Sequence, residues 1–350
     1  MTSSKTTTSV SKAAVLVAGS WGTALASVLR DNGHDVTLWT RNRAQAEEIN
    51  GSRTNGRYLP DTRLPEGLSA TTDIASAVKD AALVLFAAPS SAMREVVRQA
   101  APHMPPGALC VHAAKGFEAG TLKRMTTVMA EELGRPGTDM VVLSGPSHAE
   151  EVVRRLPTTV VVASASQEAA EHAQDLFINN CFRVYTNADV IGVEVAAAIK
   201  NIIALAAGLS DGLGFGDNAK AALITRGLTE IGRLGEAMGA HLLTFAGLAG
   251  VGDLVVTCTS KHSRNWRAGA MLAQGLALDE VLSRMGMVVE GVRTTRAARE
   301  LADRYGVQMP ITDALYGVLF DGTTPKEAVE RLMGRGRTHE IEEIARHWSS

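Results

Sequence analysis

This sequence is poor in cysteine and in aromatic residues, and it has almost no net charge. Its three cysteines, Cys110, Cys181 and Cys258, are far apart and form no C-x-x-C pair. That usage argues against a disulfide framework and favours a reducing cytoplasm. The formal net charge of −2 gives no sign of a nucleic-acid or an anionic membrane partner. A small polyanionic substrate needs only a local basic cluster and is not excluded.

Long uncharged apolar runs are missing too. The longest candidate, around residues 195–209, is interrupted by Lys200 and Asn201, so we expect no stable membrane insertion. The first residues, MTSSKTTTSVSK, have no apolar core of a secretory signal and no arginine. We expect residues 1–12 to be a disordered leader.

Motifs for metal binding and for serine nucleophiles are also lacking. His112, His148 and His262 lie in separate segments without metal-ligand spacing, so we assign no metal site. The G-x-S-x-G pattern occurs once, as GLSDG at residues 208–212, but no strand-like run precedes it, so it is not the nucleophile elbow of α/β hydrolases.

What the sequence does contain, from about residue 13 to 187, is an alternation of short apolar runs and helix-like segments. Seven runs have the composition of strands that are buried on both faces: AAVLVA, DVTLWT, AALVLFAA, ALCVHAA, DMVVLSG, TTVVVAS and FRVYTN. We therefore predict an α/β domain over residues 13–189, with a mostly parallel sheet wrapped by helices.

Strand-like runs stop after this point, which predicts an all-α domain over residues 190–350. The segment DNAKAALITRGLTEIGRLGEAMGA is predicted to be a long helix, with Asp217 or Asn218 as its N-cap and Gly239 at its end. The segment TTPKEAVERLM matches a capping box with proline at the first helical position.

The segment VLVAGSWGTALA resembles a dinucleotide-binding turn with one departure. Gly19 and Gly22 fill the second and third positions of the G-x-G-x-x-G pattern, but Val17 occupies the first. Gly19 would let the backbone approach a pyrophosphate, and Gly22 would let helix and strand pack closely. A tight turn without a ligand is the alternative. Our hypothesis is a slightly displaced turn with weakened cofactor binding, since a β-branched residue restricts the backbone there.

About twenty residues further on, the second strand ends in LWTRNR. Arg41 and Arg43 stand where an acidic residue would bind the 2′-hydroxyl of NAD. Because guanidinium groups pair with a 2′-phosphate, we predict that NADP is accepted and is preferred over NAD. A solvated pair of arginines is the alternative.

The apolar segment GVEVAAAIKNIIALAAGL contains one lysine, Lys200. A helix of this composition should be buried almost all round, and a buried lysine is costly unless it is paired or functional. Desolvation would lower its pKa towards neutrality, as proton transfer requires. A structural ion pair, for example with Glu194 or another acid, is the alternative.

Other polar groups follow strands or gather in one loop. Lys115 in AAKGFE and Ser147 in LSGPSHAE come just after strands, where open α/β sheets bind ligands. The loop CTSKHSRNWRAG is rich in donors that suit a phosphate, and Arg264 offers a bidentate fork. A solvated basic loop is the alternative.

Several segments together resemble the bacterial-type NAD(P)-dependent glycerol-3-phosphate dehydrogenases. They are GSWGTALA, AAKGFE, SGPSHAEEV, EVAAAIKNIIALAAGLSDGLGFGDNAKAALITRGLTEI, GVGDLVVTCTSKHSRN and VVEG. These pieces occur in the order found in the family and cover nearly the whole chain after the leader.

The resemblance implies an N-terminal Rossmann-like domain, a helical C-terminal domain and an active site between them. It implies reversible reduction of dihydroxyacetone phosphate to sn-glycerol 3-phosphate with NADP(H) or NAD(H), in glycerophospholipid synthesis. A cytoplasmic homodimer is a further expectation of the family. Lys200 matches the lysine that accepts the proton during oxidation and donates it during reduction.

The resemblance also implies the site residues. The catalytic ones are Lys200, Lys115 and Asp253. The substrate contacts are Lys115, Gly145, Ser147, Lys200, Asp253, Ser263, Arg264 and Asn265. The cofactor contacts are Gly19, Ser20, Trp21, Gly22, Arg41, Lys115, Ala149, Arg264, Val288 and Glu290.

In this scheme Lys115 adds positive charge near the carbonyl oxygen, while Arg264 and Asn265 hold the phosphate. Asp253 orients either Lys200 or a substrate hydroxyl, and the sequence leaves both open. Two rival functions remain: a related dehydrogenase of the 3-hydroxyacid or 6-phosphogluconate type, and a non-catalytic paralogue that senses metabolites.

Overall fold

The computed structural model describes residues 10–336. The predicted leader, residues 1–12, lies mostly outside the described residues. Its last residue, Lys12, is already part of the first strand, so the prediction was wrong at that position.

A single sheet of eight strands forms the first half of the described chain. The order is β3-β2-β1-β4-β5-β6-β7-β8, and all neighbours are parallel except β6 and β7. The strands are β1 (Lys12–Leu16), β2 (Asp35–Trp39), β3 (Ser69–Thr71), β4 (Leu83–Phe86), β5 (Leu109–His112), β6 (Met140–Ser144), β7 (Thr158–Ala163) and β8 (Phe182–Asn187). The predicted, mostly parallel sheet is confirmed. Strand β3 was missed, because three residues with two hydroxyl side chains do not form an apolar run.

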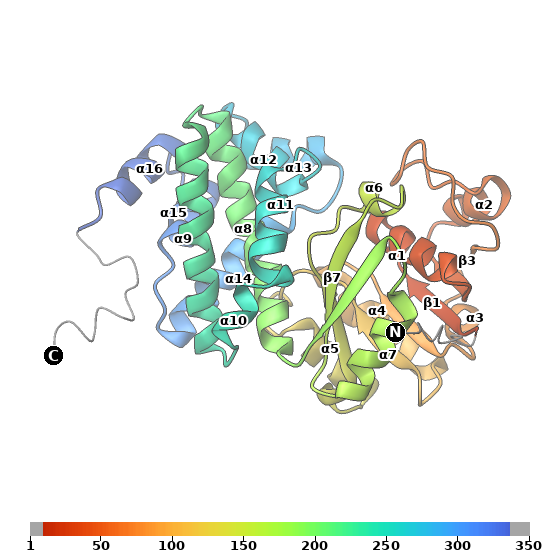
Figure 1. Ribbon diagram of the computed structural model, residues 1–350. Helices are drawn as coiled ribbons and strands as arrows, with labels where there is room; N and C mark the ends of the chain where they lie inside the picture. The colour runs from red at the N-terminus through yellow and green to blue at the C-terminus, as the bar shows by residue number, and fades with distance from the viewer. Residues whose placement is uncertain (1–9, 337–350) are drawn as a thin grey trace.

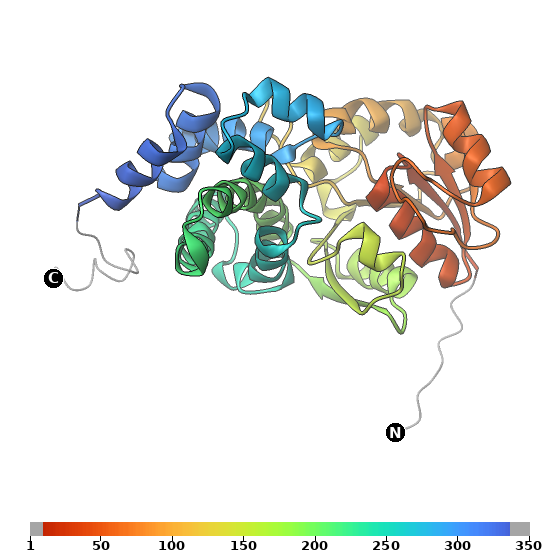
Figure 2. The ribbon, with the colours of Figure 1, turned by 90° about the horizontal axis from the view of Figure 1, so that it is seen from above.

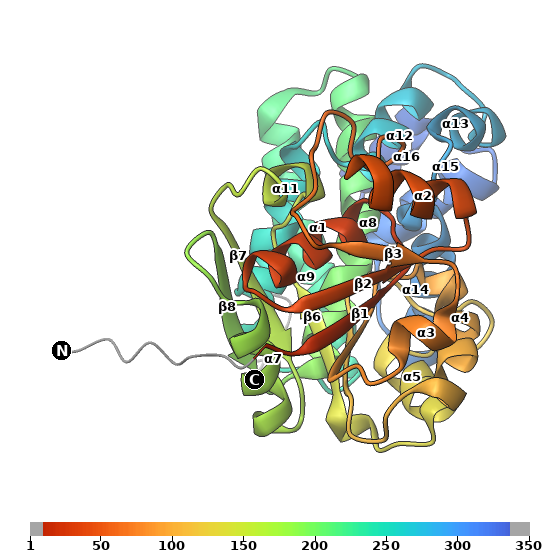
Figure 3. The same ribbon diagram turned by 90° about the vertical axis from the view of Figure 1, so that its right-hand side faces the viewer.

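Helices cover both faces of this sheet (Figure 3). On one face Val15 packs with Leu25 and other residues of α1, and on the other Leu16 packs with Val97 of α4. This alternation explains why the strand is continuously apolar. The helices of this half are α1 (Ser20–Asp31), α2 (Arg43–Ser52), α3 (Ile74–Val78), α4 (Met93–Ala100), α5 (Met125–Leu133), α6 (Ala149–Val152) and α7 (Gln167–Phe177).

The second half is helical and lies beside the sheet domain (Figures 1 and 2). Its elements are α8 (Val190–Gly212), α9 (Gly216–Ala237), α10 (Leu242–Phe245), η4 (Leu248–Gly252), α11 (Asp253–Thr259), α12 (Arg264–Ala273), α13 (Leu278–Met285), α14 (Glu290–Tyr305), α15 (Pro310–Phe320) and α16 (Pro325–Met333). Helix α8 lies at the centre, packed against α9, α11, α12 and α14.

Helix ends show where the sequence was informative. The capping box of α16 is confirmed, and Gly239, with φ +95°, follows the end of α9 as predicted. The N-cap of α9 is Phe215, so the assignment to Asp217 or Asn218 was wrong. Gly214 and Gly216 both have positive φ and turn the chain within a few residues, which lets the helix begin earlier.

Two described segments have the length and hydropathy of a membrane span, α8 and Leu242–Thr259. Within α8, 83% of the apolar window is buried inside the protein, as in a core helix. The second segment is divided into α10 and α11, because Gly250 between them has non-helical φ and ψ.

Candidate active site

A pocket lies between the two domains, at the carboxyl ends of the parallel strands. Its wall contains residues that follow β1, β4, β5 and β6, together with residues of α8, α11 and α12. Twelve of the predicted site residues line it: Ser20, Trp21, Lys115, Ser147, Ala149, Lys200, Asp253, Ser263, Arg264, Asn265, Val288 and Glu290.

The turn between β1 and α1 is built around a strained valine. Val17 has φ +80°, the left-handed conformation that glycine usually supplies at this position. The backbone N–H groups of Val17 and Ala18 both donate to the Trp39 carbonyl, at 3.0 and 3.1 Å, and hold the turn. The valine therefore adopts the unfavourable conformation itself.

The two glycines of this turn have different roles. A Cβ atom added to Gly22 would lie 2.2 Å from the Val17 carbonyl oxygen, whereas one added to Gly19 would meet no atom within 4 Å. Gly22 is thus required for helix-to-strand packing, and the backbone at Gly19 is open to a ligand. In the first turn of α1, the Trp21 indole Nε1 is buried without a hydrogen-bond partner among residues 10–336.

Asp253 joins two lysines at the base of the pocket. Lys200 Nζ donates to Asp253 Oδ1 at 2.6 Å, and Lys115 Nζ donates to Oδ2 at 2.7 Å. Lys200 also donates to Thr257 Oγ1 at 2.6 Å, one turn further along α11. The sequence reasoning missed Thr257, because its only signal was the four-residue spacing from Asp253.

Glu194, offered as an ion-pair partner of Lys200, was the wrong carboxylate. The two residues are six positions apart on α8, so their side chains point about 120° apart around the helix. Glu194 instead pairs with Arg124 of the α/β domain. Of the two possibilities for Asp253, the structure shows that it contacts Lys200.

The electrostatics of this centre follow from burial and from the shared carboxylate. Burial lowers the pKa of Lys200, Asp253 opposes this effect and the charge of Lys115 adds to it, and the net result is a pKa of about 8. Burial would raise the pKa of Asp253, but the two lysines outweigh it and hold that pKa below its ordinary value. The carboxylate therefore stays charged while the lysine can exchange a proton near neutral pH.

The start of α12 brings the predicted phosphate-binding residues to the pocket. Ser263 is the N-cap of α12, and the exposed Arg264 follows it. Asn265 is buried; its amide donates to Asn201 Oδ1 at 2.8 Å and accepts from the Gly291 N–H at 2.9 Å. Asn265 therefore links α8, α12 and α14, with one N–H left for a ligand.

Two further predicted residues, Gly145 and Arg41, are not part of the pocket wall. The Gly145 carbonyl accepts hydrogen bonds from Lys115 Nζ at 3.4 Å and from Ser147 Oγ at 2.8 Å. Arg41 lies outside the pocket wall on the exposed turn after β2, while Arg43 pairs with Glu47 at 2.8 Å. Only Arg41 of this arginine pair lacks an ion pair within residues 10–336.

Some residues in or beside the pocket were not assigned from the sequence. Asn201 donates to the Lys115 carbonyl at 3.3 Å, and Ser90 donates to Glu290 at 3.1 Å across the two domains. Burial raises the pKa of Glu290. The His148 ring lies 5.8 Å from the His262 ring. Burial lowers the pKa of His148. These residues meet only in the fold, since they come from different elements.

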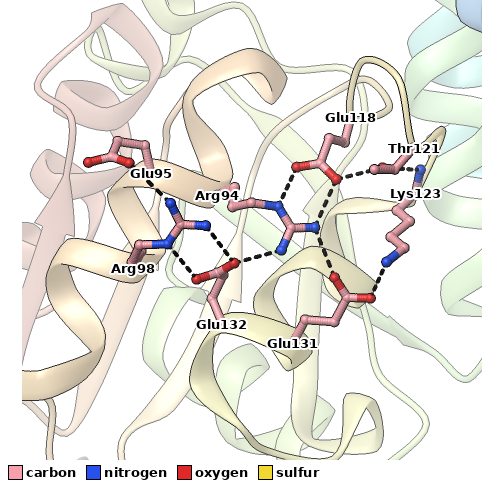
Figure 4. A network of polar contacts seen from close by, with 8 residues as sticks. All are labelled: Arg94, Glu95, Arg98, Glu118, Thr121, Lys123, Glu131 and Glu132. Atoms are coloured by element: carbon pink, nitrogen blue, oxygen red, sulfur yellow. Dashed lines mark hydrogen bonds and ion pairs between the residues drawn. The ribbon is translucent and has the colours of Figure 1, made fainter.

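A charged network holds the loop that carries Lys115 (Figure 4). Arg94 of α4 contacts Glu118 of that loop at 2.6 Å, and it also contacts Glu131 and Glu132 of α5 at 2.8 and 2.6 Å. The network joins α4, α5 and the loop that carries Lys115.

No group of three His, Cys, Asp or Glu side chains suited to a metal ion occurs within residues 10–336.

Comparison with known proteins agrees with this geometry. Residues 12–170 match the family described as NAD-dependent glycerol-3-phosphate dehydrogenase N-terminus, and residues 189–330 match its C-terminus. A Geobacillus kaustophilus protein named glycerol-3-phosphate dehydrogenase (NAD(P)+) is 61% identical over 332 residues, covering 95% of this chain and 96% of the relative. For the protein of that name from Bacillus subtilis, the identity is 58% over 334 residues, with coverage of 95% and 97%.

Among solved structures, glycerol-3-phosphate dehydrogenase from Coxiella burnetii superposes with a TM-score of 0.89 at 40% identity. The match covers 93% of this chain and 99% of that one.

Proposed function

The chain belongs to the NAD-dependent glycerol-3-phosphate dehydrogenase family, and we propose that it reversibly reduces dihydroxyacetone phosphate to sn-glycerol 3-phosphate. It is an NAD(P)-dependent oxidoreductase acting on a CH–OH group, and it supplies glycerophospholipid synthesis. The observation that carries the proposal is the pair of lysines joined by Asp253 in the interdomain pocket. Ketone reduction needs a proton donor and positive charge beside the carbonyl oxygen, and these residues provide both.

The turn between β1 and α1 fits a nicotinamide dinucleotide. The backbone at Gly19 is open, the N-terminus of α1 favours the charge of a pyrophosphate, and the Trp21 Nε1 has no hydrogen-bond partner among residues 10–336. The other cofactor contacts that we propose are Ser20, Gly22, Lys115, Ala149, Arg264, Val288 and Glu290. When bound, the reduced cofactor supplies the hydride.

Arg41 would hold the 2′-phosphate of NADP. It lies on the exposed turn after β2, where its guanidinium can pair with a phosphate, whereas Arg43 is engaged by Glu47. A preference for NADP over NAD therefore depends on Arg41. A kcat/KM with NADPH well below that with NADH would contradict this preference.

Lys200 is the proton donor during reduction and the proton acceptor during oxidation. A pKa of about 8 makes both protonation states accessible near neutral pH. Asp253 and Thr257 hold the Nζ atom from one side, which orients the remaining proton. Lys115 stabilises the negative charge that develops on the substrate oxygen.

The substrate phosphate is bound at the start of α12. Arg264 is exposed there and offers a planar fork, and Ser263, Asn265, Gly145 and Ser147 complete the substrate contacts that we propose. Phosphate binding orients the ketone and uses binding energy remote from the reacting carbon.

Replacement of Arg264 tests the phosphate site. We expect Arg264→Ala to raise the KM for dihydroxyacetone phosphate by about tenfold or more, because a charge-assisted bidentate contact is lost. Steady-state kinetics at saturating NADPH measure this effect. An unchanged KM would assign the phosphate to another group.

The activity itself is tested by the loss of NADPH absorbance on addition of dihydroxyacetone phosphate. With NADPH we expect turnover of this ketone, and with NADP+ we expect no turnover of 3-hydroxyacids or 6-phosphogluconate. A folded protein that binds NADPH without turnover would instead be a metabolite sensor.

We further propose a homodimer in the cytoplasm, without stable membrane insertion or a nucleic-acid partner. The resemblance to the family and the nearly neutral net charge support this proposal. Sedimentation equilibrium measures the oligomeric state directly.

A further inference from the structure

Helix α8 carries a second buried carboxylate, Glu194, that the proposed reaction does not use. Its side chain is 3% exposed, and it accepts hydrogen bonds from Arg124 Nη1 at 2.5 Å and from Thr126 N and Oγ1 at 2.8 and 2.7 Å. His112 Nε2 lies 3.2 Å away. Burial would raise the pKa of Glu194, but these neighbours hold it well below its usual range. Glu194 is therefore a charged group in the interior.

All of these partners belong to the α/β domain and flank the segment that carries Lys115. His112 is the last residue of β5, Arg124 is the N-cap of α5, and Thr126 lies in the first turn of α5. Lys115 lies between them, on residues 113–123. One carboxylate of α8 thus contacts both ends of this segment.

The same helix carries Lys200, six residues beyond Glu194 and so about 9 Å along the axis. The two lysines meet at Asp253, whose two oxygens are 2.6 and 2.7 Å from the Nζ atoms. Their separation therefore depends on how the segment is held against α8. The segment also packs on α8 through the apolar cluster that contains Phe117 and Leu122. Among the hydrogen bonds within residues 10–336, the other one between this segment and α8 near the lysines is the 3.3 Å bond from Asn201 to the Lys115 carbonyl. That bond is long and attaches only one point of the segment.

We propose that Glu194 is a positioning residue that fixes Lys115 relative to Lys200 across the junction of the two domains. This inference rests on the proposed function. A purely structural carboxylate would contribute to the stability of the protein and leave the chemistry of Lys200 unchanged.

The pH dependence of Lys200 separates these two roles. The charged and titratable groups around Lys200 are Asp253 and Cys258 of α11, Lys115 of the loop after β5, and His148 of the loop after β6. The charge of Lys115 lowers the pKa of Lys200. If Lys115 moves away, the pKa of Lys200 rises, and the loss of reductase activity at alkaline pH shifts to higher pH.

The test compares Glu194→Gln with Glu230→Gln in the full chain. Glu230 is also buried, but its carboxylate accepts from Ile311 N and Thr312 N of α15, and it does not line the interdomain pocket. For Glu194→Gln we expect kcat/KM for dihydroxyacetone phosphate to fall by about tenfold or more, with the Kd for NADPH within about twofold of wild type. We also expect the loss of reductase activity at alkaline pH to occur at a higher pH than in the wild type. Glu230→Gln should have the same pH dependence of kcat/KM as the wild type, even if its Tm changes.

A milder variant and an assay without turnover complete the test. Thr126→Val removes one hydroxyl donor to Glu194 and should shift the profile in the same direction if Glu194→Gln does not fold. The pH dependence of Lys200 modification by cyanate, read by mass spectrometry, reports the pKa of the lysine without substrate. An unchanged modification profile in these variants would overturn the positioning role. Inactivity of the wild type towards dihydroxyacetone phosphate would overturn the proposed function alone.

Discussion

At the scale of single residues, Val17 and Lys200 show how departures from a pattern mark the site. Both were recognised from the sequence because a β-branched residue replaces a glycine and because a lysine interrupts an apolar helix. The structure adds the physical cost in each case, a left-handed backbone at Val17 and a buried ammonium at Lys200. The partner of Lys200 could not be derived from the pattern, since Asp253 lies 53 residues away and meets it only when α11 packs on α8.

Val17→Gly tests the turn. A β-branched residue in this conformation stores about 1–3 kcal/mol of strain, which glycine would relieve. The lost contacts of the valine and the greater freedom of glycine in the unfolded chain oppose this gain, so we expect little change in Tm. We expect tighter NADPH binding, measured as Kd by titration calorimetry. Equal or tighter binding by the valine form would show that the turn does not need the first glycine.

At the scale of elements, close approach of helix and strand positions the cofactor turn. The sequence predicted this through Gly22, and the structure explains it, because a Cβ atom added at Gly22 would lie 2.2 Å from the Val17 carbonyl oxygen. Helix ends were less predictable: the capping box of α16 is local and was found, whereas the start of α9 depends on the geometry of the turn from α8. Strand β3 was missed because its pairing with β2, rather than its own composition, defines it.

Gly22→Ala should disrupt this packing. The added methyl group collides with backbone, which cannot move without displacing β1, so we expect a loss of about 2 kcal/mol or more in the free energy of unfolding and weak NADPH binding. Urea unfolding measures the first quantity. Gly51→Ala in α2 is the matched control, because a Cβ there meets no atom within 4 Å. Equal stability of the two variants would contradict the packing argument.

The charged network between α4 and α5 is a second test at this scale. Arg94 bonds the loop that carries Lys115, so Arg94→Ala should raise the KM for dihydroxyacetone phosphate and lower the free energy of unfolding by about 1–2 kcal/mol. Arg98→Ala is the control, because Arg98 is 58% exposed and pairs with Glu95 and Glu132 but not with the loop. If both variants had the same KM, the network would have no influence on Lys115.

At the scale of the whole molecule, the pocket forms where two domains of different class meet. The α/β fold, the helical second half, the enzyme class and the NAD(P) cofactor were predicted from the sequence and are confirmed. The residue contacts inside the pocket were not predictable in the same way. Lys115, Lys200 and Asp253 come from three elements of two domains, and periodicity within one segment contains no information about such contacts.

The pKa of Lys200, which is buried where the two domains meet, also determines how the activity should depend on pH. Reduction needs protonated Lys200, so its rate should fall as pH rises through about 8, whereas oxidation needs the neutral amine and should increase through the same range. Rates in both directions across pH 6 to 10, a range of about two units on each side of this pKa, measure the effect. Parallel changes in the two directions would contradict a single proton-transferring lysine.

The most direct test of the central claim is the kcat of Lys200→Ala with dihydroxyacetone phosphate and NADPH. The account predicts a fall of about 10²-fold or more, with a nearly unchanged Kd for NADPH, because the proton donor is lost while the cofactor turn stays intact. A kcat close to that of the wild type would remove Lys200 from the mechanism.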